Sequence, residues 1–254
     1  PETKKIFQQA YPNFKNKILI QKDLANTLKI IASKGKKGFY EGEIAEKISS
    51  EMKKNDGLIS KSDLKKYNPV WREPLISDYK DTKIITMGPP SSGGLHVIQM
   101  LNILDNFNLK KIKHNSSEYI NLLAETMKYA YADRSKYLGD PDFYNVPVKK
   151  VTSKKYANEI SNNIKIGKAA SVEDIYPGKF IENESHETTH FSVVDKNGNV
   201  VSMTYTLNST FGSKVVIKGT GILMNNEMDD FSAAPGIPNQ FNLLGAEANQ
   251  IAPY

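Results

Sequence analysis

Residues 186–208, HETTHFSVVDKNGNVVSMTYTLN, carry hydroxyl and amide side chains at both ends of the segment. Thr188 and Thr189 stand near its start, and Thr206 and Asn208 stand near its end. A threonine hydroxyl is a weak nucleophile that attacks a carbonyl only when a base lies nearby. A Thr–Thr pair is also a common structural pair in sheets. The spacing alone leaves the catalytic and the structural interpretation open.

The residues between these ends predict a β-hairpin. Segments 190–195 and 200–206 alternate polar with apolar residues and are rich in Val, Thr, Phe and Tyr. Asn197-Gly198 between them is a strong hairpin-turn signal. We therefore expect two antiparallel strands whose open end carries the threonines.

The length of the turn decides which threonines face each other. A two-residue loop at Asn197-Gly198 pairs Thr188 with Leu207. A three-residue loop with Gly198 left-handed pairs Thr188 with Thr206. Cross-strand partners share a face, and Asn208 lies two residues further along that face. In this second register Thr188, Thr206 and Asn208 gather where the hairpin opens.

Composition places the chain among ordinary globular proteins. It has 254 residues, 39% hydrophobic and 24% charged, and no cysteine. This excludes disulfides and thiolate metal sites. No apolar run approaches the roughly 18 residues that a membrane helix needs. The chain shows no signal peptide and starts at Pro1, so we expect that an upstream segment is missing.

A net charge of +6 raises the alternative of nucleic-acid binding. Arg72 and Arg134 are the only arginines, and all the other basic residues are lysines or histidines. Arginine is the residue suited to bidentate phosphate and guanine contacts. The charge pattern therefore favours a lysine-rich solvated surface, and no nucleic-acid partner is expected.

The chain before residue 188 reads mainly as helices. Periodicity and capping residues predict helices and a pair of strands, and residues 172–187, which are polar and without period, predict a surface loop. After residue 188 the pattern favours strands, with a further strand over 215–225, so we expect a layered α/β fold with a mixed or antiparallel sheet. The expected helices cover 24–33, 43–53, 60–67, 91–104, 116–137 and 151–166, and the two strands lie within 72–87.

Two upstream motifs have tempting functional interpretations. Ser91-Ser-Gly-Gly94 could suggest a phosphate cradle, but the glycine spacing is wrong and no Gly-Lys-Ser/Thr follows. A tight strand-to-helix turn with serine N-caps is the better interpretation. Asp133, Asp140 and Asp142 could suggest a cation, but their spacing does not match a calcium loop. They favour a helix end followed by a turn.

The pattern around Thr188 resembles the γ-glutamyltransferase (γ-glutamyltranspeptidase, glutathione hydrolase) family. The resemblance runs from about Gln21 to the end of the chain. Its most specific stretches are residues 187–195 (ETTHFSVVD), 204–208 (TYTLN) and 225–232 (NNEMDDFS), and supporting stretches are QKDLANTL at 21–28, GFYEG at 38–42, PPSSGG at 89–94 and YADRS through GDPDF at 131–143.

This resemblance implies an N-terminal-nucleophile hydrolase with a four-layer αββα sandwich, helix-rich before residue 188 and strand-rich after it. Such a chain cuts itself before a threonine, here between Glu187 and Thr188. Residues 1–187 would then form the α-rich part of a large subunit. Residues 188–254 would form the start of a β-rich small subunit, within one structural domain.

The resemblance also implies roles for individual residues. Thr188 would be the nucleophile, with its own α-amine as base after the cut, and Thr206 would orient its hydroxyl. Asn208, Glu227 and Asp230 match the family's positions for binding the α-ammonium of the γ-glutamyl group. The stretch 235–241 resembles the family's lid, with Phe241 as the shielding aromatic residue.

Departures from the family pattern limit what this chain is expected to do alone. The family's carboxylate-binding arginine lies upstream of Pro1, and neither Arg72 nor Arg134 matches it. Its second Ser-Ser pair and oxyanion-hole glycines lie beyond Tyr254. The chain thus resembles the middle of a family member without both flanks. We expect the 254 residues alone to be inactive or nearly so.

The implied reactants are γ-glutamyl compounds such as glutathione, with water, amino acids or peptides as acceptors. No metal or cofactor is expected, and bacterial members imply a periplasmic or secreted location. The alternative is a non-catalytic binding scaffold in which Thr188 is never processed. His186 and His190 could suggest a Ser/His system, but without a Gly-x-Ser-x-Gly elbow they are interpreted as structural.

Overall fold

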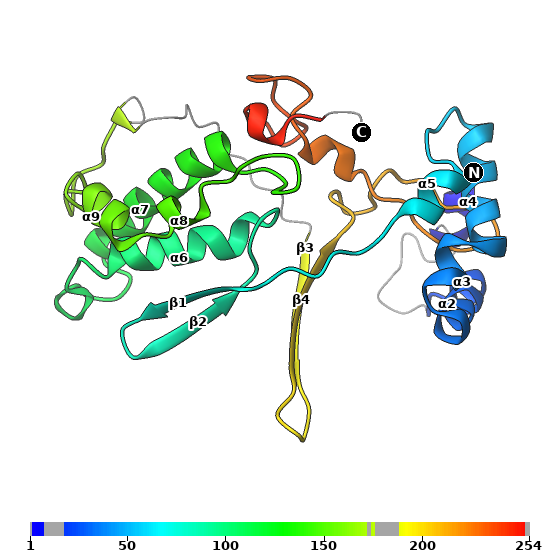
Figure 1. The fold of residues 1–254 in the computed structure, drawn as a ribbon, viewed down its shortest axis with the longest axis horizontal. Coiled ribbons are helices and arrows are strands. Elements are labelled where there is room, and N and C mark those ends of the chain that lie inside the picture. The colour runs from blue at the N-terminus through cyan, green and yellow to red at the C-terminus, as the bar shows by residue number, and fades with distance from the viewer. Residues whose placement is uncertain (1, 8–17, 172–173, 176–187, 252–254) are drawn as a thin grey trace. The chain divides into compact units, whose positions relative to one another are not determined.

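The computed structural model describes residues 2–7, 18–171, 174–175 and 188–251 (Figure 1). The chain divides into two compact units. Unit 1 comprises Pro1–Val70 and Ser185–Met228, and unit 2 comprises Trp71–Glu184 and Asp229–Tyr254. Each unit thus combines a segment that precedes Thr188 in the sequence with one that follows it.

The helices predicted over 24–33, 43–53 and 60–67 are present in unit 1, whereas the short helices Glu2–Phe7 and Lys36–Tyr40 were not predicted. Gly35, with φ of +58°, follows the end of α2, and only glycine adopts this conformation without strain. Ser60 and Asp63 form a reciprocal capping box that starts α5. The helices are α1 (Glu2–Phe7), α2 (Lys22–Lys34), α3 (Lys36–Tyr40), α4 (Gly42–Lys54) and α5 (Lys61–Lys66).

The core of unit 1 joins residues from both sides of Thr188. Ile44 and Ile48 of α4 pack against Ile217, and all three are buried. The hydroxyl of Thr27 donates to the carbonyl of Thr220 over 2.8 Å, and both residues are buried. The loop around Ile217 is therefore held against α2 and α4 by apolar burial and by a hydrogen bond shielded from water.

The strand predicted over 215–225 is wrong. This stretch contains a single isolated antiparallel bridge, between Val216 and Leu223. Gly219 and Gly221 have φ of +70° and +67°. These left-handed conformations turn the chain tightly, so the apolar residues that suggested a strand instead fill the helical core.

The hairpin predicted around Asn197-Gly198 is present. Strands β3 (Thr188–Val194) and β4 (Val200–Thr206) pair antiparallel, and appear as the long yellow ribbon in Figure 1. Alternation along β4 separates Ser202 and Thr204 from Val201, Met203 and Tyr205. One face of the hairpin is therefore polar and the other apolar.

Unit 2 is a helical layer with a small hairpin. Strands β1 (Leu75–Tyr79) and β2 (Thr82–Thr86) pair antiparallel, within the range that the sequence predicts. Helix α6 packs against α7 and α9 (Figure 1), and the core between them contains Ile103, Leu122 and Ile160. The helical elements are α6 (Ser92–Leu104), η2 (Leu109–Lys111), α7 (Ser117–Tyr137), α8 (Val148–Val151), α9 (Lys154–Ser161) and η5 (Glu247–Asn249).

Two predictions in unit 2 need correction. The helix expected over 151–166 is only α9, which ends at Ser161 where Asn162 and Asn163 follow; asparagine side chains compete for backbone hydrogen bonds. Ser91 precedes α6 as its N-cap residue, but its side chain makes no capping hydrogen bond. The loop expected over 172–187 falls largely outside the described residues.

The Ser91-Ser-Gly-Gly94 motif is a tight strand-to-helix turn, as predicted. A Cβ atom on Gly94 would lie 2.0 Å from the carbonyl oxygen of Met87. Glycine is therefore required for α6 to start this close to the end of β2. The motif is explained by packing, without any phosphate.

Candidate active site

The backbone register at the open end of the hairpin is the one given by the three-residue turn. Thr188 of β3 and Thr206 of β4 are Cα partners. Gly198 has φ of +83°, and the Asp195 N–H donates to the Asn199 carbonyl over 3.0 Å. Of the two registers that the sequence leaves open, the structure has the one that pairs Thr188 with Thr206, and not with Leu207.

A direct hydrogen bond joins Thr206 to Asn208. The Asn208 N–H donates to Oγ1 of Thr206 over 2.9 Å. A hydroxyl has two acceptor lone pairs and one donor proton, so this bond uses a lone pair and not the proton. The contact fixes the position of the Thr206 hydroxyl oxygen.

Asn208 is buried, and its side-chain amide is held by a backbone carbonyl. It has φ of +73°, a left-handed conformation that asparagine tolerates better than most residues. Its Nδ2 donates to the carbonyl of Asn226 over 3.1 Å, and the residue is only 4% exposed. The chain thus leaves β4 in a sharp turn that places a fixed amide next to Thr206.

Asn226 organises this turn, and sequence reasoning missed its role. Its Oδ1 accepts the Ser209 N–H over 3.0 Å and its Nδ2 donates to Ser209 Oγ over 3.2 Å. Its own N–H donates to the Leu207 carbonyl over 3.1 Å. The signal was the adjacent pair Asn225-Asn226, since asparagines commonly hold irregular backbone through their side chains.

The two predicted carboxylates lie on one 3-10 turn, η4 (Glu227–Asp230). Glu227 is half-buried in unit 1, and its N–H donates to Asn225 Oδ1 over 3.0 Å. Asp230 is exposed in unit 2, and its carbonyl accepts Nδ2 of Asn249 over 2.7 Å. The backbone that carries each carboxylate is therefore held by an asparagine side chain, Asn225 for Glu227 and Asn249 for Asp230.

Arg134 of α7 is the charged neighbour of Asp230. Burial lowers the pKa of the Arg134 guanidinium below its ordinary value, and the negative charge of Asp230 opposes this shift. A buried cation attracts a nearby carboxylate more strongly than an exposed one, because solvent screens it less. Arg134 and Asp230 are therefore a pair of opposite charges that attract each other within unit 2.

The predicted aromatic lid residue is at the tip of a braced loop in unit 2. The N–H groups of Phe241 and Leu243 both donate to Oδ1 of Asn239, each over 3.0 Å. An isolated bridge joins Pro238 to Leu244 on either side of this tip. Phe241 is therefore presented by an ordered turn.

The predicted site residues divide between the two units. Unit 1 brings together the backbone positions of Thr188, Thr206 and Asn208, and also contains Glu227. Unit 2 contains Asp230 and Phe241. Glu187, on the other side of the predicted cut, lies outside the described residues.

His190 has a structural arrangement on the polar face of the hairpin. Its Nδ1 is 2.7 Å from Oγ1 of Thr204, and its Nε2 is 3.1 Å from Oγ of Ser202. Both ring nitrogens are thus engaged within the hairpin, which fits the structural interpretation; His186 lies outside the described residues. Among the residues that the structure describes, no cluster of three potential metal ligands occurs.

A second polar cluster is buried between α6, α7 and α9 in unit 2. Nε2 of Gln99 donates to Oδ2 of Asp133, and the Tyr156 hydroxyl donates to Oδ1 over 3.0 Å. His96 Nδ1 lies 2.8 Å from Gln99 Oε1. Burial raises the pKa of the Asp133 carboxyl, and these two hydrogen bonds act in the opposite direction. Asp133 therefore serves the helix packing, and α7 ends at Tyr137 before the turn with Asp140 and Asp142, which is the helix end followed by a turn that the sequence predicts.

Asp140 and Asp142 instead bind Arg72. The Arg72 guanidinium donates to both oxygens of Asp142, over 3.0 and 2.7 Å, and to Asp140 over 3.3 Å. The hydrogen bond with Asp142 raises the pKa of Arg72. The turn after α7 is thereby fixed to the segment that precedes β1.

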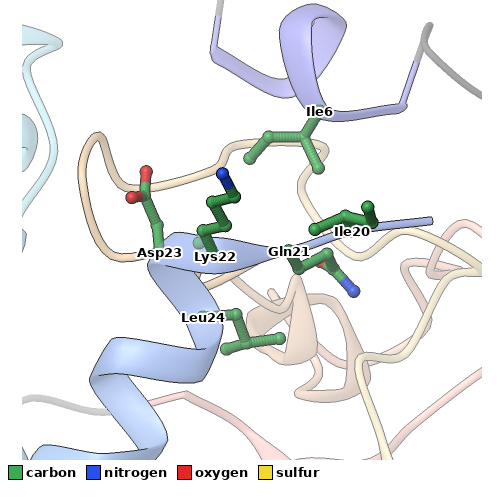
Figure 2. Close-up of a pocket in the computed structure, with 7 residues that line it drawn as sticks. Ile6, Ile20, Gln21, Lys22, Asp23 and Leu24 are labelled. Carbon is green, nitrogen blue, oxygen red and sulfur yellow. The ribbon is translucent and has the colours of Figure 1, made fainter.

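A pocket of about 430 Å³ lies in unit 1 where α2 begins. Figure 2 shows Ile6 of α1 on one side and Ile20, Gln21, Lys22 and Leu24 along the other. None of the predicted catalytic or binding residues lines it. Its lining combines the aliphatic Ile6, Ile20 and Leu24 with Gln21, Lys22 and Asp23 at the helix start, and no hydroxyl or thiol side chain is among the lining residues.

Comparison with known proteins identifies the relatives of this arrangement. The family model described as gamma-glutamyltranspeptidase matches residues 1–254. A glutathione hydrolase proenzyme of Escherichia coli (strain K12) is 51% identical over 252 residues, covering 99% of this chain and 43% of that protein. The chain therefore spans less than half the length of this curated relative.

Solved structures agree with the sequence relationship. The gamma-glutamyltranspeptidase of Helicobacter pylori matches 64% of this chain and 46% of its own, at 48% identity and a TM-score of 0.62. The cephalosporin acylase of Bacillus halodurans matches 97% of this chain and 45% of its own, at 26% identity and a TM-score of 0.73. The predicted class, α+β of the N-terminal-nucleophile hydrolase type, is confirmed.

Proposed function

This chain belongs to the gamma-glutamyltranspeptidase family, and from that premise we propose that the full gene product transfers or hydrolyses γ-glutamyl groups through Thr188. The observation that carries the proposal is the register of the hairpin. Thr188 begins β3 directly opposite Thr206, whose hydroxyl oxygen is held by the N–H of Asn208. In this proposal the nucleophile stands at a strand terminus, opposite the position of Thr206.

The proposed maturation step creates the catalytic base. The Thr188 hydroxyl attacks the Glu187 carbonyl, the peptide C–N bond breaks, and an ester links Glu187 to Thr188. Water then hydrolyses the ester, leaving a carboxylate on Glu187 and a free α-amine on Thr188. An amide nitrogen is not a base, whereas an α-amine has a pKa of about 7.7–8.0 and can accept a proton near neutral pH.

The same hydroxyl then performs the proposed turnover. The α-amine of Thr188 takes the hydroxyl proton as the oxygen attacks the γ-carbonyl of the donor. That proton passes to the departing amine, and a γ-glutamyl ester remains on the enzyme. Water or an acceptor amine attacks this ester and regenerates Thr188. Thr206 donates to the Thr188 oxygen and orients it.

Substrate selection in this proposal depends on charge. The α-ammonium of a γ-glutamyl group has three donors, and ionised acceptors form the strongest hydrogen bonds to it. Glu227 and Asp230 on η4 supply carboxylates, and Asn208 supplies an amide carbonyl. Phe241 would cover the bound group and exclude water.

The proposed division of the chain follows from the cut. Residues 1–187 belong to a large subunit and 188–254 to a small one, held together by contacts such as Thr27 with Thr220. Glutathione is the proposed donor, with water, amino acids or peptides as acceptors, and the proposed location is periplasmic or secreted. Among the described residues, no helix is both long and apolar enough to span a bilayer.

Sequence identity favours γ-glutamyl over other acyl donors. The chain is 48% identical to the Helicobacter pylori transpeptidase over the matched region, but 26% identical to the cephalosporin acylase. The carboxylates at 227 and 230 also favour a donor that carries an ammonium group. The alternative is a binding scaffold in which Thr188 stays within an intact chain.

An assay of the full gene product with γ-glutamyl-p-nitroanilide tests the proposal. We expect steady release of p-nitroaniline that disappears in Thr188→Ala. The matched control is Thr189→Ala, on the next residue of the same strand, which we expect to retain activity. Equal release by the wild type and Thr188→Ala would refute the proposed nucleophile. No release by a correctly folded wild type would favour the scaffold.

A further inference from the structure

The loop that carries Phe241 contacts the end of α7 in unit 2. The C-terminal loop is defined as residues 232–251. Its tip is braced from within, because the Asn239 side chain accepts two N–H groups and Pro238 bridges to Leu244. Asp229, just before the loop, accepts the N–H of Gln240 at 3.2 Å from each carboxylate oxygen.

The base of the C-terminal loop is closed around Ser232. The Ser232 N–H donates to the Asn249 carbonyl over 2.8 Å, and the Ile251 N–H donates to the Ser232 carbonyl over 3.1 Å. A Cβ atom on Gly245 would lie 1.8 Å from Ser232 Oγ. The two ends of the loop are therefore held in contact, so the loop forms one closed piece.

Two residues at the end of α7 meet this piece. The Ser135 hydroxyl donates to the Leu244 carbonyl over 2.9 Å, although the two residues are 109 positions apart. Gly139, two residues after the helix, packs so closely that a Cβ atom there would lie 1.9 Å from the Ala248 carbonyl oxygen. Leu244 is also the bridge partner of Pro238, so the Ser135 bond acts on the turn that presents Phe241.

We propose that Ser135 and Gly139 are positioning residues that hold the turn presenting Phe241, the proposed lid residue. This rests on the proposed function, in which the C-terminal loop is the lid. After the cut, Ser135 and Gly139 belong to the large subunit and the loop to the small one. The large subunit thus positions the lid of the small subunit through two contacts that sequence patterns do not reveal.

Asp133 and Arg134, which precede Ser135 in α7, also fit a role of this helix end in holding the C-terminal loop. Asp133 points into the helix packing toward Gln99 and Tyr156, while Arg134 is attracted to Asp230. Consecutive residues of α7 thus serve the core on one side and the small-subunit segment on the other. Because α7 is anchored by its core contacts, its end is a rigid support for the loop.

Variants of the full gene product test this proposal. Ser135→Ala removes the bond to Leu244, and Ser135→Thr keeps a hydroxyl. Gly139→Ala forces Ala248 to move. The matched controls are Ser161→Ala, whose hydroxyl bonds only within α9 to Asn158, and Gly93→Ala, whose Cβ would meet only Ser91 Oγ at 3.8 Å.

Two readouts are needed, namely amide hydrogen exchange over 235–245 and the KM and kcat for γ-glutamyl-p-nitroanilide. For Ser135→Ala and Gly139→Ala we expect faster exchange over 235–245. We also expect KM to rise about twofold to tenfold, the loss of one net hydrogen bond, with little change in kcat or in self-cleavage. Ser135→Thr restores the wild-type values in part, and both controls match the wild type.

The outcomes separate this proposal from the proposed function. Unchanged amide exchange over 235–245 in both Ser135→Ala and Gly139→Ala would overturn the positioning role of Ser135 and Gly139. Faster exchange with an unchanged KM would overturn it too. If Gly139→Ala does not fold, Ser135→Ala decides alone. If the wild type releases no p-nitroaniline, the proposed function fails, and the exchange data then decide whether Ser135 and Gly139 hold the loop.

Discussion

Thr188 and Thr206 occupy directly opposed positions of the β3–β4 ladder, at the end remote from the Asn197-Gly198 turn. The pairing follows from one left-handed glycine, Gly198, which lengthens the turn to three residues. A two-residue turn would place Leu207 opposite Thr188 instead. The geometry of the proposed nucleophile therefore depends on a turn nine residues away along each strand.

We expect the Thr206 hydroxyl to be required for catalysis. In Thr206→Ala the Asn208 N–H loses its acceptor and the hydroxyl that is proposed to orient Thr188 is absent, so kcat should fall about 10²-fold. Thr206→Ser keeps the hydroxyl and should stay within about tenfold of the wild type. Initial rates with γ-glutamyl-p-nitroanilide measure both. Equal activity of the alanine and serine variants would contradict the orienting role.

Gly198 should be needed for the stability of the hairpin. Its φ of +83° is strained for an L-residue, so Gly198→Ala should lower the free energy of unfolding by about 1–2 kcal/mol. Gly93→Ala is the control, because Gly93 lies in α6, its Cβ would make only an ordinary contact with Ser91 Oγ at 3.8 Å, and alanine favours a helix by about 0.5–1 kcal/mol. Urea unfolding followed by circular dichroism should show opposite signs for the two variants.

The loop at Ile217 should be an essential part of the core of unit 1. Ile217 is fully buried against Ile44 and Ile48, so Ile217→Ala should cost about 2–5 kcal/mol. Ile76→Ala is the control, since Ile76 is 61% exposed and its loss should cost about 0.5 kcal/mol or less. Similar costs in urea unfolding would show that residues 215–224 do not belong to the core.

Stability should depend on pH through Asp133. Because burial raises its pKa in the folded state, the folded protein binds this proton more tightly than the unfolded chain. The stability from this group is complete below the unfolded pKa of about 3.9 and is lost as pH rises through the folded pKa. The free energy of unfolding of the wild type minus that of Asp133→Asn should therefore be larger at pH 4 than at pH 7.

A second variant sharpens this test. The Tyr156 hydroxyl donates to Asp133 and holds its pKa down, so Tyr156→Phe should extend the loss of stability to higher pH. Urea titrations across this pH range measure both variants. A difference between the wild type and Asp133→Asn that stays constant with pH, or that grows as pH rises, would contradict the assignment.

Local signals predicted the elements that depend on a few neighbouring residues. Asn197-Gly198 predicted the hairpin and left two registers open, and Ser60 with Asp63 predicted the start of α5. The sequence pattern gave a wrong prediction where tertiary contacts determine the local structure. The apolar residues of 215–225 resemble a strand, but Gly219, Gly221 and the contact with α4 make them an irregular core loop.

The site was predictable only in part for the same reason. The facing positions of Thr188 and Thr206 follow from the pairing of a hairpin, and the resemblance supplied Glu227, Asp230 and Phe241. The residues that hold these site residues in place could not be predicted from the sequence. Asn226 acts through an irregular turn, and Ser135 meets Leu244 across 109 positions that no sequence period connects.

The most direct test of the central claim is the intact mass and N-terminal sequence of the purified full gene product after prolonged incubation. We predict two fragments, the smaller beginning Thr-Thr-His-Phe-Ser, and a single uncut species for Thr188→Ala. A single uncut wild-type species that still releases p-nitroaniline from γ-glutamyl-p-nitroanilide would contradict the account. So would a cut at any bond other than that between Glu187 and Thr188.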